Sequence, residues 1–323
     1  MLIKDNLLRD NPKRPGSLDD LPPPQHFTPV FSDDRKEAMT CLEEMRAVVD
    51  EFEGRVLAGE VQGKIDRIGH FYGEDAKPRF HLPLNFALLD SAWDVVSLQA
   101  QIDAYLAALP EHAWPDWVIG GHDKHRIASK IGQPQARVLA MLLMTLPGTP
   151  FLFAGDEIGM ERVKIPGDRI VDPFEKLVPG YGLNRDPERS PMRWDRSINS
   201  GFSVGEPWLP MEPPSGRNVQ SQRNERHSLL RLYRSLMKLR QNELALTIGS
   251  YRPLRSTNDI LRYERTFDGT TLLIALNLVH QPRKLDECPR STLLLSTKLD
   301  GDCDETDGPM LLRADEGVVL KLL

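Results

Sequence analysis

The chain has 323 residues, of which 40% are hydrophobic and 27% charged, a composition that is ordinary for a globular protein. Its formal net charge of -6 and the lack of a basic cluster argue against nucleic acid or an anionic membrane as the main partner. No apolar run reaches the length of a membrane span, and the N-terminus lacks the pattern of a secretory signal. We therefore expect a cytoplasmic protein with no membrane partner.

Helical and strand patterns alternate from residue 35 to about residue 154. Apolar residues at three- and four-residue steps predict helices over 35–53, 98–109 and 134–144. Short apolar runs predict strands at about 55–60, 80–85, 117–121 and 151–154. This alternation is typical of a parallel sheet with helical crossovers.

A long irregular segment, rich in Pro, Gly and Arg, follows at about 160–224. Segments of this length in compact proteins are usually functional loops, and Trp194 and Trp208 predict that this one is anchored by packed aromatic rings. A helix is predicted from Leu229, and short β runs separated by turns follow. These runs are 260–265, 271–277, 292–295, 310–313 and 318–322.

Two domains are expected from this order of elements. Residues 1–245, with the long loop, form a partial (β/α) barrel domain, and residues 246–323 form a small antiparallel β-sandwich domain. Four parallel strands are half of the eight that a closed barrel needs. The predicted fold is therefore α/β, the second half of a (β/α)8 barrel with strands 5–8 and the first half absent.

Two of the predicted strands end in acidic residues. One apolar run ends at Glu60, and another is followed by two glycines and then by His122 and Asp123. Because active sites form at the carboxyl ends of parallel strands, we expect Glu60 and Asp123 to serve one site. Taken alone, Glu60 is more typical of a solvated strand end than of a catalytic residue. The pair Asp156-Glu157 is expected to have a structural role.

A metal site at His122, Asp123 and His125 is the main alternative for this stretch. Neighbouring side chains of an extended segment point to opposite faces, and no further ligand cluster converges there. We therefore expect neither a metal nor a cofactor.

Four stretches of the chain resemble the α-glucosidase branch of glycoside hydrolase family thirteen, the α-amylase family. They are Val56–Val61, Gly121–Asp123, Phe151–Met160 and a loop with Asp172–Lys176 and Gly182–Asp195. The resemblance covers nearly the whole chain. It implies a barrel fold followed by a β-sandwich, and retaining hydrolysis or transglycosylation of α-linked glucosyl oligosaccharides without a redox cofactor.

The resemblance also implies roles for individual residues. Glu60 would be the catalytic acid/base, and Asp123 would bind ring hydroxyls and favour the cationic transition state. His122 would hold the same sugar. Arg189, with Arg185, would close the end of the pocket that recognises a non-reducing glucose.

Two departures from the family pattern affect this reading. Gly121 replaces an asparagine, and we expect it to lie outside direct contact with the sugar. The family's nucleophile lies on its fourth strand, upstream of a segment like Leu2–Pro12, and here Met1 begins after that strand. The resemblance thus implies the C-terminal part of an α-glucosidase-type enzyme, inactive alone without its nucleophile.

The sequence is also compatible with other functions. The chain could be one subunit of a split enzyme, completed by the missing N-terminal half or by self-association. It could be a non-catalytic sugar-binding protein, or a transglycosylase of the same family.

Overall fold

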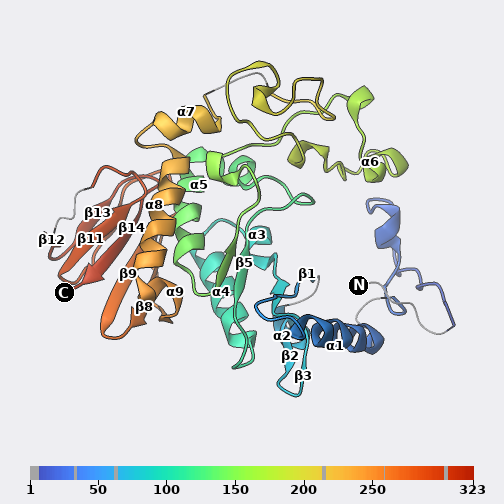
Figure 1. Ribbon diagram of the computed structural model, residues 1–323, viewed down its shortest axis with the longest axis horizontal. Helices are drawn as coiled ribbons and strands as arrows, with labels where there is room; N and C mark the ends of the chain where they lie inside the picture. The colour runs from blue at the N-terminus through green and yellow to red at the C-terminus, as the bar shows by residue number, and fades with distance from the viewer. Residues whose placement is uncertain (1–6, 33–34, 62–64, 213–215, 258, 302–304) are drawn as a thin grey trace.

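The computed structural model describes residues 7–32, 35–61, 65–212, 216–257, 259–301 and 305–323 (Figure 1). The segment Leu2–Pro12 is therefore described only from Leu7 onward. An antiparallel sheet lies at one side of the molecule, helices and short parallel strands lie beside it, and a long loop runs above them (Figure 1). No helix of the described residues is long and apolar enough to cross a membrane.

Four short parallel strands carry the candidate site. β1 pairs with β4, β5 pairs with β6, and β4 contacts β5. The strands are β1 (Ala58–Glu60), β4 (Leu82–Leu84), β5 (Asp116–Val118) and β6 (Thr149–Phe151). Longer helices alternate with them, namely α1 (Lys36–Asp50), α4 (Val95–Ala108) and α5 (Ile127–Thr145). The predicted α/β alternation with parallel pairing is thus confirmed.

The bounds of the last parallel strand were predicted incorrectly. β6 ends at Phe151, where the strand predicted over 151–154 was to begin. Pro150 lies inside β6 opposite Trp117. In the described residues β6 pairs on one side only, and a proline is tolerated on such an edge strand because its missing N–H is not needed for pairing.

Short elements connect these strands and were not predicted. The helices are α2 (Gly69–Tyr72) and α3 (Ala87–Asp90), and the small antiparallel pair is β2 (Gly73–Glu74) with β3 (Lys77–Pro78). Single 3-10 turns occur at η1 (Pro23–His26), η2 (Ile65–Arg67) and η3 (Asp156–Ile158).

Helix α5 is the centre of the main hydrophobic core. Gly132 adopts a φ of 78° and interrupts the helix just before Pro134, so the helix predicted from Pro134 is the second segment of α5. Residues 138–145 are all buried, as expected for a helix that is apolar on every face. This segment contacts α8 (Leu229–Asn242) and the antiparallel sheet, so one core joins the two parts of the chain.

A six-stranded antiparallel sheet forms the C-terminal part, in the order β12-β11-β14-β9-β8-β7. Its strands are β7 (Ser250–Pro253), β8 (Ile260–Phe267), β9 (Thr270–Asn277), β11 (Ser291–Ser296), β12 (Glu305–Thr306) and β14 (Gly317–Leu322). A second pair, β10 (Arg283–Leu285) with β13 (Met310–Leu312), covers a small core of its own. All five predicted β runs are strands, and short α9 (Leu244–Thr247) precedes them.

The helices that the structure describes in the long loop are all short. They are η4 (Gly167–Arg169), α6 (Pro173–Leu177), η5 (Asp186–Glu188), η6 (Ile198–Gly201) and α7 (Val219–Asn224). Trp194 and Trp208 are 49% and 54% exposed, so the prediction that their rings anchor the loop is wrong. Buried charged residues hold it instead, including Asp172, Glu188 and Arg193.

Candidate active site

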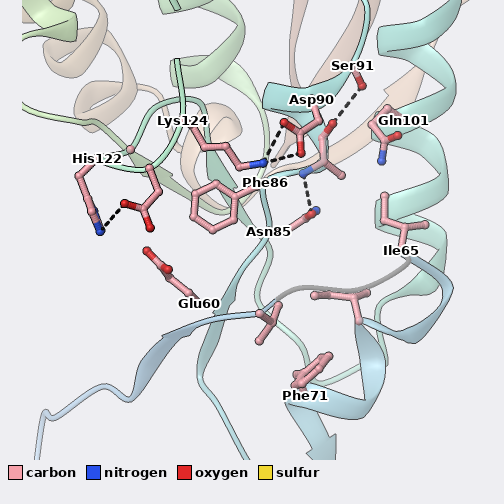
Figure 2. Close-up of a pocket in the computed structure, with 15 residues that line it drawn as sticks. Glu60, Ile65, Phe71, Asn85, Phe86, Asp90, Ser91, Gln101, His122 and Lys124 are labelled. Atoms are coloured by element: carbon pink, nitrogen blue, oxygen red, sulfur yellow. Dashed lines mark hydrogen bonds and ion pairs between the residues drawn. The ribbon is translucent and has the colours of Figure 1, made fainter. Parts of the chain in front are cut away.

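Glu60 is the last residue of β1 and is exposed to a cavity of about 540 Å³. The strand packs closely just before it, because a Cβ on Gly59 would lie 2.4 Å from the ring of Phe80. His122 and Asp123, which follow β5, line the same cavity. Figure 2 shows Glu60 and His122 extending toward this common space from their two strand ends.

His122 and Asp123 interact with each other. His122 Nε2 lies 3.3 Å from Asp123 Oδ1, an ion pair when the imidazole is protonated. Residues 122–123 form a turn, so the expectation that neighbouring side chains point to opposite faces is wrong here. Among the described residues, no group of three or more His, Cys, Asp or Glu side chains could hold a metal ion.

Two arginines of the long loop reach Asp123. Arg185 donates to Asp123 Oδ1 at 3.2 Å, and Arg189 donates to the same oxygen. Arg189 also donates through Nε to the carbonyl of His122 at 3.1 Å. These hydrogen bonds thus hold the long loop against the turn after β5, at His122 and Asp123.

Arg185 is itself held by Asp172. Its Nε and Nη2 donate to the two oxygens of the Asp172 carboxylate at 2.9 and 2.8 Å, and its guanidinium lies 4.6 Å from the ring centroid of Phe174. These hydrogen bonds hold the pKa of Asp172 well below its usual range. Asp172 therefore stays ionised at neutral pH and fixes the orientation of Arg185 toward Asp123.

The opposite wall of the cavity was not predicted. Lys124 Nζ donates to both oxygens of Asp90 at 3.1 and 3.0 Å, and Phe86 lies beside this ion pair (Figure 2). Phe86 follows the end of β4, so an aromatic residue after a predicted strand was the available signal. Nothing in the sequence indicates that Lys124 pairs with Asp90.

Gly121 lines the cavity, and its lack of direct contact with the sugar stays a prediction. A Cβ at this position would lie 3.6 Å from the ring of Phe86, which is an ordinary contact distance. The glycine therefore leaves additional space between the turn after β5 and the Phe86 wall.

Asp156 and Glu157 are structural, as expected. Buried Asp156 lies 3.5 Å from Nη1 of buried Arg126, which also donates to the carbonyl of Ala154 at 2.6 Å. Burial raises the pKa of Asp156 to about 6. Glu157 accepts a hydrogen bond from the backbone of Gly155 at 2.7 Å. Both acids thus brace the turn that follows β6.

Asp116, at the start of β5, is another buried acid. Its Oδ1 accepts the N–H of Asn85 at 3.2 Å, while its Oδ2 has no hydrogen-bond partner in the described part of the chain. Burial raises its pKa to about 7. No sequence signal distinguished this acid from the exposed ones.

The described geometry matches a known family. The model of the alpha-amylase catalytic domain matches residues 7–249, and the chain belongs to that family. The predicted resemblance is therefore confirmed at the level of the family.

The chain is similar to individual members of this family. Maltase A1 of Drosophila melanogaster is 31% identical over 272 residues, which are 80% of this chain and 47% of that protein. The amino acid transporter heavy chain SLC3A1 of Homo sapiens is 36% identical over 210 residues, 64% of this chain and 29% of that protein. The chain thus spans about half or less of the length of these relatives.

A solved structure of the alpha-glucosyl transfer enzyme XgtA superimposes with a TM-score of 0.87 at 26% identity, covering 99% of this chain and 62% of that one. The fold is accordingly of the barrel type of this family, followed by a β-sheet domain.

Proposed function

We propose that the chain provides the acid/base side of a retaining α-glucosidase site that acts on α-linked glucosyl oligosaccharides. The observation that carries the proposal is one cavity lined by Glu60 and Asp123, from two parallel strand ends, with Arg185 and Arg189 fastened to Asp123. These are the residue types that glucoside cleavage requires, a proton donor and a carboxylate beside the cationic sugar.

In this proposal Glu60 protonates the departing glycosidic oxygen from its exposed position on the cavity wall. Asp123 and His122 bind hydroxyls of the glucosyl unit, and the Asp123 carboxylate stabilises the positive charge that develops at the anomeric carbon. Arg185 and Arg189 hold the Asp123 carboxylate in place through hydrogen bonds and close the cavity behind it. A closed end admits a terminal glucosyl unit rather than the middle of a glucan.

Retaining cleavage also needs a carboxylate nucleophile about 5–5.5 Å from the acid. Among the described residues, the carboxylates that line the cavity are Glu60, Asp90 and Asp123. Asp90 is paired with Lys124, and Asp123 with two arginines. We propose that the four parallel strands are the second half of a barrel and that residues outside this chain supply the nucleophile. The isolated chain then binds sugar without cleaving it.

Turnover of the purified chain tests this proposal. We expect no glucose release from maltose or from an aryl α-glucoside, and maltose affinity unchanged within about threefold in Glu60→Gln, since Glu60 donates a proton and does not hold the sugar. If the wild-type chain releases glucose and Glu60→Gln abolishes that release, the chain is active alone and Glu60 is still supported as the acid. If Glu60→Gln releases glucose as fast as wild type, Glu60 is not the proton donor.

Two other functions have specific support. The similarity to XgtA, a glucosyl transfer enzyme, favours transglycosylation, which would give longer oligosaccharides in place of glucose in a turnover assay. The similarity to a transporter heavy chain favours a non-catalytic partner protein, in which maltose would not bind the cavity at all.

A further inference from the structure

A second, smaller hollow lies on the long loop, where residues 194–195 meet helix α7. It has a volume of about 410 Å³ and shares no lining residue with the cavity around Glu60. Its lining residues are Trp194, Asp195, Val219, Gln220, Arg223 and Asn224. In Figure 1 helix α7 lies above α5 and α8.

The indole of Trp194 is presented on a fixed frame. The backbone N–H of Trp194 donates to Ser200 at 2.8 Å, and its carbonyl accepts the N–H of Gln220 at 2.9 Å. Arg196 Nε donates to Ser221 Oγ on α7 at 3.2 Å and ties the loop to the helix a second time. A ring that is 49% exposed on so constrained a backbone is available for stacking, and its binding would require little ordering of the backbone.

The turn after Trp194 is equally constrained. Asp195 accepts hydrogen bonds from the backbone and the hydroxyl of Ser197. Gly201 adopts a φ of 67°, and a Cβ there would lie 2.5 Å from the Asp195 carboxylate. The positive φ and this close approach both favour glycine at position 201.

Three polar side chains of α7 face the hollow together. Along α7, Arg223 and Asn224 lie three and four residues after Gln220, and this spacing places side chains on one face of a helix. All three residues are exposed, and their side chains form no hydrogen bond with other described residues. Two amides and a guanidinium thus offer free donors and acceptors next to an aromatic face.

This combination fits a neutral, polyhydroxylated ligand. The electron-rich face of an indole attracts C–H groups such as those of a pyranose, and amide and guanidinium groups bind hydroxyls. A strongly anionic or cationic ligand is disfavoured, because Asp195 and Arg223 bring opposite charges to the same hollow. We propose that it is a second carbohydrate site, which binds α-linked gluco-oligosaccharides away from the cavity. The choice of glucose as the sugar rests on the proposed function.

The test is affinity electrophoresis of the whole chain in native gels containing amylopectin, with maltoheptaose titrations of the same variants. We expect the gel to retard the wild-type chain. Trp194→Ala should weaken glucan binding at least about tenfold, a loss of about 1.4 kcal/mol. The matched control is Trp208→Ala, a half-exposed tryptophan of the same loop outside the hollow, and it should bind like wild type.

Asp123→Asn separates the two sites, because it should weaken maltose binding in the cavity and leave retardation by amylopectin unchanged. If Trp194→Ala does not fold, as judged by its circular dichroism melt, the double variant Gln220→Ala/Asn224→Ala of exposed residues should weaken retardation at least about threefold. The proposal is overturned if wild type is not retarded, if Trp194→Ala or the double variant binds like wild type, or if Asp123→Asn alone abolishes retardation.

Discussion

The carboxylate of Asp123 shows how side chains distant in sequence build one site. Arg189 lies 66 residues further along the chain, and it bonds both this carboxylate and the carbonyl of His122. We expect Arg189→Ala to weaken maltose binding at least about tenfold, since a hydrogen bond between charged groups contributes about 1.5–3 kcal/mol. Isothermal titration calorimetry with maltose measures the affinity of the variant and of wild type. Arg169→Ala, which removes a loop arginine paired with Glu206, is the control and should bind like wild type.

Buried Asp116 makes a pH-dependent contribution to stability. Its pKa is raised to about 7 in the folded chain, against an ordinary value of about 3.9 when unfolded. The neutral acid therefore stabilises the fold fully below about pH 4, and this contribution is lost as pH rises through 7. Asp116→Asn should thus be more stable than wild type at pH 8, by about 2–4 kcal/mol, and equal to it near pH 4. Urea unfolding at both pH values measures the free energy of unfolding of the variant and of wild type. If the two proteins differed by the same amount at pH 4 and pH 8, the raised pKa of Asp116 would be contradicted.

The sequence predicted candidate site residues where a local pattern marked them. Glu60 and Asp123 follow apolar runs, and in parallel strands such positions meet at one edge. Asp116 and the Asp90–Lys124 pair had no such mark, because Asp116 bonds Asn85 and Lys124 bonds Asp90 across 31 and 34 residues of sequence. Burial and long-range ion pairs are properties of the packed chain.

At the scale of elements, helix α4 begins with a strong cap. The Asp94 carboxylate accepts the N–H of Ser97 at 2.8 Å and the Ser97 hydroxyl at 2.7 Å. We expect Asp94→Ala to lower the free energy of unfolding by about 1 kcal/mol at pH 7, because an orphan N–H of the first turn loses its acceptor. Glu44→Ala, on the exposed face of α1, serves as control and should change stability by less than about 0.5 kcal/mol. Equal effects in urea unfolding would refute the capping role.

Helices were predicted more closely than the parallel strands. Three- and four-residue apolar spacing runs over many residues in α1 and α4, whereas each parallel strand has three residues and no periodicity to read. At β6, Gly148 adopts a φ of 96°, and a Cβ there would strike the carbonyl of Pro115. This contact lies between segments 33 residues apart, so the start of the strand is fixed by tertiary packing.

At the scale of the whole molecule, one hydrophobic core joins both parts of the chain. Met141 and Leu143 of α5, Leu236 of α8 and Ile274 of β9 are all buried in it. The composition changes near residue 246, which suggested two domains, but the core does not divide there. We therefore expect a single calorimetric unfolding transition. Two separate transitions would show that residues 246–323 unfold independently.

The central claim is that Glu60 and Asp123 share one glucosyl-binding cavity. Its most direct test is calorimetric titration of maltose into the wild-type chain, Asp123→Asn and Asp75→Asn, the last a highly exposed acid outside that cavity. We predict that wild type and Asp75→Asn bind maltose alike and that Asp123→Asn binds at least about tenfold more weakly. Absence of binding by wild type, or equal binding by Asp123→Asn, would contradict the claim.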